Sequence, residues 1–422
     1  MADLLFFTDR YPYNNSEAFI ENEISIMSSY YDNVYILPCG LMVDTDTIRN
    51  VPSNVHVLPP ATSGTIYTKK PSYLKKIFWA TKNLYIWIIA CLFNGYFYKE
   101  LSFLLFNIGF TIPRLLKIFR TLAPALRNRF HFKKELKKYG ITEYYAYSYW
   151  IEPTVLFAND ILPDAIIKKV FCRTHRWDLY IEESPINYLA FQKQIINFVD
   201  KVYVISKDGV EYLKKIYPNS KSKILLSRLG TIDRGLNPKE KDDVYRVVSC
   251  SNIIPVKRVE LIIEILRMLS LRHLNIEWIH FGTGQYFDQI NEYAKSQLRN
   301  VHYEFKGLVP NYKIMEFYLH SHIDLFVNVS LSEGIPVSIM EACSCGIPVV
   351  ATNVGGTGEI VHDGLNGFLL EKNFTVDDVV NKIECLMQED IAEKMRAESR
   401  LIWEKNYNCT VNYTEFYNSI GK

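Results

Sequence analysis

The chain contains 422 residues, of which 48 are lysine or arginine and 46 are aspartate or glutamate, so its formal net charge is +2. The hydrophobic content of 48% and the charged content of 22% are typical of globular proteins and exclude wholesale disorder. The near-zero charge argues against a generic nucleic-acid binder, which would be strongly basic, and the length predicts two or three domains.

Short apolar runs, each followed by an amphipathic helix-like stretch, recur along the chain. In the first half they begin at residues 4, 34, 144, 169 and 201, and in the second half at residues 244, 276, 301, 324 and 348. Strands that alternate with helices in this way form parallel sheets from βαβ units. The sequence therefore predicts an α/β protein with two doubly wound, Rossmann-like domains. Ligands are expected in the interdomain cleft, outside the carboxyl ends of the strands.

The charged, helix-breaking stretch 233–243 separates the two sets of runs and is interpreted as a linker. The predicted domains are residues 1–232 and 244–400, and residues 401–422 are expected to form a helix that packs back on the first domain. Met1–Phe7 has an aspartate where a secretion signal has basic residues, and the eight cysteines are widely scattered. We therefore expect a cytoplasmic protein with reduced thiols.

Residues 69–138 of the first domain carry 15 lysines or arginines and two acidic residues, a net charge of +13 that leaves −11 for the rest of the chain. Aromatic and aliphatic runs lie between these basic residues. The longest charge-free stretch, Asn83–Tyr98, has 16 residues, fewer than the roughly 20 needed to span a bilayer. This composition is typical of a helix lying on an anionic membrane surface, so we expect a protein peripheral to the inner face of the cell membrane. The alternative is a helical insertion that packs on its own domain.

The densest chemistry lies in the segment 330–370. Glu333-Gly334 follows an apolar run and precedes an apolar helix expected to begin at residue 335 or 336. Gly334 lets backbone approach a ligand closely, and the positive end of the helix is suited to a diphosphate. Glu341 lies eight residues after Glu333, about 12 Å along a helix, so the two carboxylates can hold hydroxyls at opposite ends of an extended ligand. The alternative is a capping glutamate followed by a solvated helix glutamate.

This segment resembles the donor-binding core of the retaining family-4 glycosyltransferases of the GT-B fold, of the type that assembles bacterial cell-surface polysaccharides. Their E-x7-E pattern appears here as EGIPVSIMEA over residues 333–342, and the match continues through Gly355-Gly356 and Gly364-x-Asn366-Gly367. The resemblance implies a GT-B fold in which the basic-aromatic segment is a helical insertion in the first domain.

Upstream, PVKRVE resembles the family's loop in which a lysine binds the donor diphosphate, and Lys257 matches that lysine. The family's usual preceding arginine is replaced by Ser251-Asn252, and Arg258 is expected to compensate. The resemblance implies a UDP- or GDP-sugar as donor. The implied donor-binding residues are Asn252, Lys257, Arg258, Gly282, Gly307, Leu308, Glu333, Gly334, Ile335, Pro336, Val337 and Glu341.

Two segments of the first domain also resemble this family. The first is SEAFI, which begins at residue 16, and the second is RTHRWDLY, which begins at residue 173. The resemblance implies that they face the acceptor, and it places the histidine of the second segment near the transferred sugar. The implied acceptor-binding residues are Ser16, Glu17, Arg173, His175 and Asp178.

The implied activity is retaining transfer of a sugar to a polyprenyl-linked or oligosaccharide acceptor in capsule, exopolysaccharide or O-antigen assembly. The predicted catalytic residues are Glu333, which balances charge on the sugar ring, Lys257, which binds the leaving diphosphate, and His175. Asp44-x-Asp46 has the spelling of a metal-dependent transferase motif but lies in a turn-like stretch, so no metal and no cofactor are predicted. The alternatives are a sugar-nucleotide epimerase of the same fold and a non-catalytic nucleotide-sugar-binding protein.

Overall fold

The computed structural model describes residues 2–13, 17–40, 48–61, 89–240, 242–272 and 275–420. The chain divides into two compact units. Unit 1 comprises the residues up to Ser227 together with the chain end from Tyr417, and unit 2 runs from Arg228 to Phe416. The interval 233–243 therefore lies within unit 2, where the buried Asn237 side chain donates to the carbonyl oxygens of Tyr318 and Ser321.

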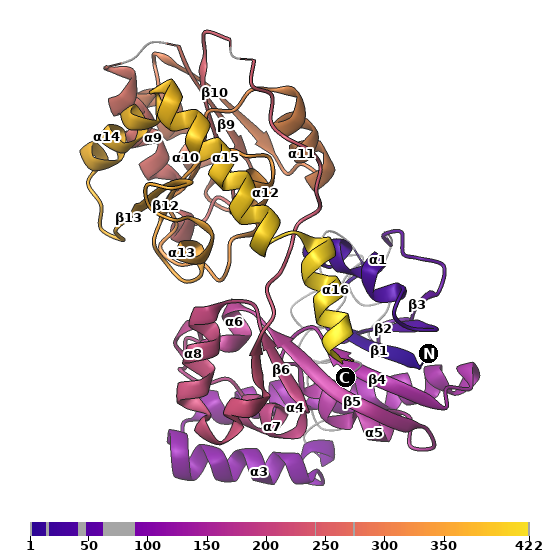
Figure 1. The fold of residues 1–422 in the computed structure, drawn as a ribbon. Helices are drawn as coiled ribbons and strands as arrows, with labels where there is room; N and C mark the ends of the chain where they lie inside the picture. Colours follow the sequence, from indigo (N-terminus) through magenta and orange to yellow (C-terminus); the bar gives the residue numbers. More distant parts are fainter. Residues whose placement is uncertain are drawn as a thin grey trace. The chain divides into compact units, whose positions relative to one another are not determined.

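Each unit is built on one parallel sheet flanked by helices (Figure 1). The described part of unit 1 has a seven-stranded sheet of order β3-β2-β1-β4-β5-β6-β7. Its strands are β1 (Asp3–Thr8), β2 (Val34–Pro38), β3 (Val55–Val57), β4 (Glu143–Ser148), β5 (Ile166–Thr174), β6 (Lys201–Val204) and β7 (Ile224–Leu226). Its helices are α1 (Glu21–Ser28), α3 (Gly95–Phe103), α4 (Ile112–Leu136), α5 (Ala158–Ile161), α6 (Arg176–Leu179), α7 (Gln192–Phe198) and α8 (Lys207–Ile216).

The described part of unit 2 has a six-stranded sheet of order β10-β9-β8-β11-β12-β13. Its strands are β8 (Tyr245–Cys250), β9 (Ile276–Phe281), β10 (Val301–Gly307), β11 (Leu325–Asn328), β12 (Val349–Thr352) and β13 (Gly367–Leu370). Its helices are α9 (Val259–Ser270), α10 (Phe287–Gln297), α11 (Asn311–His320), α12 (Val337–Ser344), α13 (Thr357–Ile360), α14 (Val376–Leu386) and α15 (Glu389–Asn406). A last helix, α16 (Cys409–Ile420), begins in unit 2 and ends in unit 1.

The predicted doubly wound architecture is confirmed. Each of the ten apolar runs forms a parallel strand. The runs could be recognised because the buried strands of a parallel sheet are hydrophobic on both faces. The sequence reading missed β3, β7 and β13, which have only three or four residues each and lie at sheet edges. The three-residue strands β3 and β7 carry too little periodicity to be recognised, and β13 begins at Gly367 within a turn-like stretch that contains Gly364.

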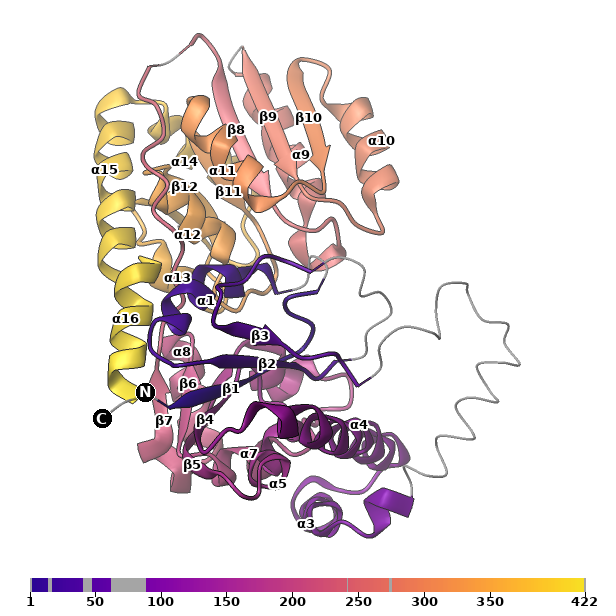
Figure 2. The ribbon, with the colours of Figure 1, turned by 90° about the vertical axis from the view of Figure 1, so that its right-hand side faces the viewer.

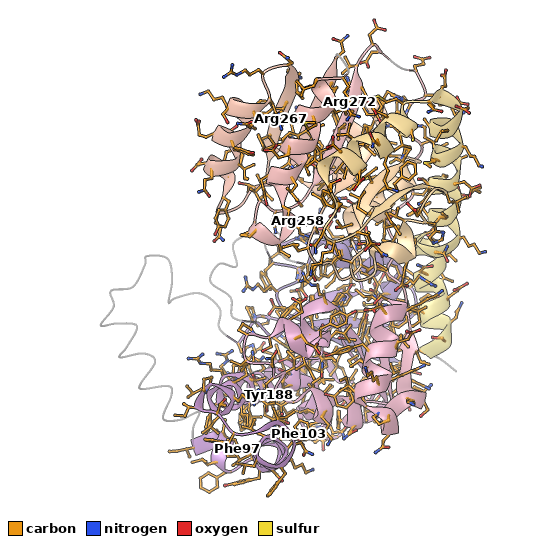
Figure 3. All side chains as sticks on the ribbon, turned by 90° about the vertical axis from the view of Figure 1, so that its left-hand side faces the viewer. Phe97, Phe103, Tyr188, Arg258, Arg267 and Arg272 are labelled. Carbon is orange, nitrogen blue, oxygen red and sulfur yellow. The ribbon has the colours of Figure 1, made fainter. Side chains whose placement is uncertain are left out.

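The described part of the basic-aromatic segment forms α3, a single π-helical stretch (Leu104–Ile108) and the long helix α4, which lie side by side (Figure 2). The buried Glu100 carboxylate of α3 accepts hydrogen bonds from Tyr188 Oη at 2.6 Å, Phe191 N at 2.9 Å and Gln194 Nε2 at 2.7 Å. Figure 3 shows Phe97 and Phe103 of α3 at the same end of unit 1 as Tyr188. Residues 89–138 therefore pack on their own domain, whereas residues 69–88 lie outside the described residues.

Candidate functional site

The sheet of unit 2 has a switch point between β8 and β11. The chain runs from β8 outward to β9 and β10 on one side, and then returns to place β11 on the other side of β8. Loops that leave neighbouring strands at such a point diverge and leave room for a ligand at the carboxyl ends of the strands. Lys257 follows β8 and Glu333 follows β11, so both residues flank this point.

The structure brings Lys257 and Glu333 into contact. Lys257 Nζ lies 2.6 Å from Glu333 Oε1, and Asn328 Nδ2 donates to the same oxygen at 3.1 Å. The loop backbones are joined as well, because Leu331 N donates to Val256 O at 2.7 Å. Glu333 is almost fully buried, and a buried ion pair fixes geometry even where it adds little stability. At the switch point, therefore, the Glu333 carboxylate is fixed in place, and the Lys257 ammonium group has further N–H donors besides the one that faces Glu333.

The backbone at Glu333 and Gly334 is fixed by a second loop. Gly356 N donates to Gly334 O at 2.6 Å, and Gly355 adopts a left-handed conformation with φ +53°. A Cβ atom at Gly355 would lie 1.9 Å from Glu333 O. Only glycine therefore lets this loop pack against the Glu333 carbonyl.

Helix α12 begins at Val337, slightly later than predicted, with Pro336 as its N-cap residue. Its N-terminal N–H groups and positive dipole end follow directly after Glu333-Gly334, the arrangement that favours an anion. Ile335 is buried and so does not offer its side chain to a ligand.

Glu341 lies on α12 and is half-buried. Burial raises the pKa of its carboxyl to about 7, although Asn311 Nδ2 donates to Oε1 at 2.7 Å and opposes that shift. Near neutral pH the group can both accept and donate hydrogen bonds, as ligand hydroxyls require. Asn311 and Asn328 were not predicted from the sequence. Asn311 begins α11 and Asn328 ends β11, and an asparagine at either place carries no distinctive pattern.

Arg258 has a different role from the one expected. It begins α9 in a left-handed conformation with φ +48°, at the opposite end of that helix from Arg267 and Arg272 (Figure 3). Its Nε donates to Val329 O at 2.6 Å, and its Nη1 donates to Lys372 O at 2.9 Å. The guanidinium therefore joins the strand-end loops, and these two donors are not available to a diphosphate.

The remaining predicted donor residues lie on neighbouring loops at the same edge of the sheet. Gly282, with φ +140°, would place a Cβ atom 1.9 Å from Ser251 O, and its N–H donates to Gly307 O at 2.9 Å. Leu308 is strongly exposed just beyond β10, and Asn252 is exposed after β8. These contacts bring the ends of β8, β9 and β10 together beside the Lys257–Glu333 pair.

In unit 1, the carboxylate of Glu17 is used within its own loop. It accepts hydrogen bonds from the backbone N–H groups of residues 9, 10 and 11 at 3.2, 2.7 and 2.6 Å, and from Trp150 Nε1 at 2.5 Å. The residue is buried, so its geometry supports positioning of the loop after β1 rather than direct contact with an acceptor. Ser16 lies outside the described residues, as do Asp44 and Asp46.

Arg173 is fully buried and pairs with the equally buried Glu23, with Nη1 2.8 Å from Oε2. Tyr417 Oη, from the chain end, donates to Glu23 Oε1 at 2.6 Å. Leaving either charge uncompensated in this position would be strongly unfavourable. The geometry gives Arg173 a structural role in unit 1.

His175 lies in an aromatic cage. Its ring stacks on Tyr149 at a centroid distance of 4.8 Å and lies 4.3 Å from Trp150 and 5.8 Å from Phe19. Burial, followed by the nearby Arg173 charge, holds its pKa well below the usual value. Both ring nitrogens are buried and make no hydrogen bond within the described structure. Buried polar atoms are normally paired, so a neutral imidazole in this state is ready for a ligand.

Asp178 fixes the backbone around that histidine. Its Oδ1 accepts from His175 N at 2.7 Å, and its Oδ2 accepts from Ile151 N at 2.8 Å. Burial raises the pKa of this carboxyl to about 7. Asp178 thus joins the loops that follow β4 and β5.

Comparisons with known proteins agree with the fold. Residues 234–405 match the family described as Glycosyl transferases group 1. The chain is 27% identical over 257 residues to an uncharacterized glycosyltransferase of Methanocaldococcus jannaschii, a match that covers 58% of this chain and 67% of the relative. It is 26% identical over 254 residues to the O-antigen biosynthesis glycosyltransferase WbnH of Escherichia coli, covering 58% of this chain and 68% of the relative.

Among solved structures, the chain is similar to Anabaena HepE in complex with UDP-glucose. The TM-score is 0.62 at 14% sequence identity, and the match covers 100% of both chains. At this identity the likeness shows the fold, which is that of the GT-B glycosyltransferases. The expected GT-B architecture is therefore confirmed.

The packing at Gly355 predicts an effect on stability. Alanine at Gly355 or at Gly364 pays a similar cost for a left-handed conformation, about 1 kcal/mol, because their φ angles are +53° and +75°. Only Gly355→Ala also collides with backbone, whereas a Cβ atom at Gly364 meets nothing within 4 Å. We expect urea denaturation to show a free energy of unfolding about 2 kcal/mol lower for Gly355→Ala than for Gly364→Ala. Equal values for the two variants would contradict the described contact.

Proposed function

We propose that this chain, whose residues 234–405 match a glycosyltransferase family, is a retaining glycosyltransferase that uses a UDP- or GDP-sugar. The observation that carries the proposal is the contact of Lys257 with Glu333 at the switch point of the unit 2 sheet. A cation, a helix N-terminus and a held carboxylate meet there, and these are the groups that cleavage of a sugar–diphosphate bond requires.

Cleavage of that bond leaves negative charge on the diphosphate and positive character on the sugar ring. Lys257 and the N-terminus of α12 stabilise the diphosphate, because donors aimed at developing charge lower the barrier. Glu333 positions the sugar hydroxyls and balances the positive ring, and Glu341 holds the ribose. His175 offers a neutral imidazole to a sugar hydroxyl. We propose that this set acts without a metal, because the ammonium group and the helix supply the positive charge.

The proposed acceptor is a polyprenyl-linked or oligosaccharide acceptor in capsule, exopolysaccharide or O-antigen assembly. The O-antigen biosynthesis transferase among the relatives supports this class of pathway. Transfer to such an acceptor also separates the proposal from a sugar-nucleotide epimerase and from a non-catalytic binding protein, since neither forms a new glycosidic bond.

The central variant is Glu333→Gln, which preserves shape and removes the charge. With a donor identified by calorimetry, we expect kcat to fall by about 10²-fold or more, while the affinity for the free nucleoside diphosphate stays within about threefold. Glu341→Gln, on the helix that follows Glu333, is the matched control, because it should weaken nucleotide binding more than it lowers kcat. The product should keep the donor's anomeric configuration by NMR and form in the presence of EDTA. Full transfer rates in Glu333→Gln would contradict the assigned role.

We further propose that unit 1 lies on an anionic membrane surface through one face of α3, the π-helical stretch and α4. No helix in the described ranges is long and apolar enough to cross a bilayer. Instead, large apolar side chains are exposed along this segment: Phe93 just before α3 is 88% exposed, Phe106 of the π-helical stretch 83% and Ile112 at the start of α4 67%. Exposed basic residues lie on the same two helices, among them Lys99 of α3 and Lys134 of α4. Exposed apolar groups with adjacent cations are the features that bind an interfacial helix to anionic lipid.

This face predicts a selective loss of membrane binding. Changing Phe93, Phe106 and Ile112 to serine should lower binding to phosphatidylglycerol-rich vesicles by at least about tenfold, or about 1.4 kcal/mol, because their apolar surface no longer enters the lipid. Flotation at low salt measures the effect. The control changes Leu236, Leu271 and Leu401, which are similarly exposed in unit 2. Equal flotation of both triple variants would show that this face does not bind lipid.

A further inference from the structure

Unit 1 contains a cavity of about 460 Å³ at the carboxyl ends of its strands. Its walls come from the residues that follow β1, β2, β4 and β5, and from one side of α4. Carboxyl ends of parallel strands are the usual location of ligands in open α/β sheets. A cavity of this size accommodates a ligand of a few hundred Å³, such as one or two sugar rings.

Two tryptophans form an aromatic corner of the cavity. Trp150 and Trp177 have ring centroids 5.1 Å apart and an interplanar angle of 46°. Trp150 is held in place because its Nε1 donates to Glu17, whereas Trp177 is 62% exposed. An exposed indole face that is not covered by protein offers apolar area to a flat or weakly polar ligand surface, such as the C–H face of a sugar ring.

Carboxyl groups supply the polar wall. Asp9 and Glu152 both line the cavity, and burial raises the pKa of Asp9 and raises that of Glu152 to about 7. Glu152 already accepts hydrogen bonds from Thr154 N at 2.8 Å and from Thr154 Oγ1 at 2.9 Å. A buried carboxyl that is protonated part of the time both donates and accepts, which suits neutral hydroxyls. It does not suit an anion at the same place.

Among the described residues, the cations that line the cavity come from α4. Lys117 and Arg120 lie three residues apart on α4, so they share a face, and both are exposed. Within the part of the chain that the structure describes, neither is ion-paired, and the nearby lining residue Glu183 is instead paired with Arg176 at 2.9 Å. Two adjacent uncompensated cations are a suitable site for phosphate oxygens.

The charges therefore divide the cavity into a part for neutral hydroxyls and a part for an anion. Leu116, immediately before Lys117, is exposed, and so is Ile112 on the same helix, which belongs to the surface proposed to contact lipid. A ligand with its anion at Lys117 and Arg120 thus has its outer end beside this apolar face.

We propose that this cavity binds a sugar joined to phosphate or diphosphate, with the sugar ring against Trp150 and Trp177 and the phosphate on Lys117 and Arg120. The inference rests on the proposed function, because such a molecule would be the acceptor. Two cations would hold the acceptor's phosphate, and two tryptophans would stack on its sugar ring, all within unit 1.

The test measures binding to the full chain by calorimetry without donor. The probes are glucose, galactose and N-acetylglucosamine, each as the free sugar, as the 1-phosphate and as the farnesyl diphosphate conjugate. We expect at least one phosphate-linked sugar to bind at least tenfold more tightly than its free sugar. If the farnesyl diphosphate conjugate binds more tightly than the 1-phosphate, the ligand is lipid-linked. If the two bind with equal affinity, the ligand is a soluble sugar phosphate. Either result supports the site.

Variants assign that binding to the cavity. Lys117→Gln with Arg120→Gln should lower the affinity at least tenfold, and so should Trp177→Ala. The matched control, Lys214→Gln with Lys215→Gln on α8, should change it less than twofold. Because Trp177, Lys117 and Arg120 are exposed, the variants should unfold in urea at the midpoint of the unchanged chain. Binding that is unaffected in both cavity variants, or absent for all phosphate-linked probes, overturns the inference.

The same variants separate this inference from the proposed function. Nucleoside diphosphate binding in unit 2 should be unchanged in all of them. If the donor binds and sugar is transferred to an added acceptor while the cavity variants behave like the unchanged chain, this inference fails and the proposed function stands. If phosphate-linked sugar binds as expected but no donor is used, the proposed function fails instead.

Discussion

The contact between Lys257 and Glu333 is the constraint on which the rest of unit 2 depends. A lysine and a buried glutamate meet at 2.6 Å only because β8 and β11 are neighbours and their loops are joined through Val256 and Leu331. The glycines at 355 and 356 hold the backbone of that glutamate from the other side, and Arg258 joins the loops through its Nε and Nη1 atoms. Several residues of the sequence motif thus fix the backbone, so that the Lys257–Glu333 pair lies before the N-terminus of α12.

The sequence was sufficient for the architecture and for part of the site. Buried parallel strands are continuous apolar runs, so ten of them were recognised. The three-residue β3 and β7 are too short to show a pattern, and β13 begins at a glycine in a turn-like stretch. The sequence placed Glu333 just before a helix, Glu341 within that helix, and Lys257 on a loop that the structure brings to Glu333. The partners Asn311 and Asn328 could not be recognised, because hydrogen bonds between residues distant in sequence follow from tertiary packing.

Charged residues of unit 1 show the limit of reading roles from residue type. Glu17 and Arg173 were expected to face an acceptor, but the first shapes the loop after β1 and the second is neutralised by Glu23 inside the core. Within the described residues, neither ring nitrogen of His175 has a hydrogen-bond partner. The overall charge of +2 similarly averages a strongly basic segment with an acidic remainder, and the described part of that segment is both packed on unit 1 and exposed along one face. The net charge therefore does not predict which surface of this protein binds an anionic partner, whereas the positions of the charged residues do.

We propose that Lys257 recognises phosphate oxygens beside Glu333. The decisive measurement compares the affinity of Lys257→Met and of the unchanged chain for a nucleoside diphosphate and for the matching nucleoside, using uridine and guanosine compounds. We expect the substitution to weaken the binding of UDP or GDP by at least about tenfold, a loss of about 1.4 kcal/mol, while the nucleoside alone binds equally well to both proteins. Equal binding of the diphosphate to both proteins, or an equal loss for nucleoside and diphosphate, would contradict it.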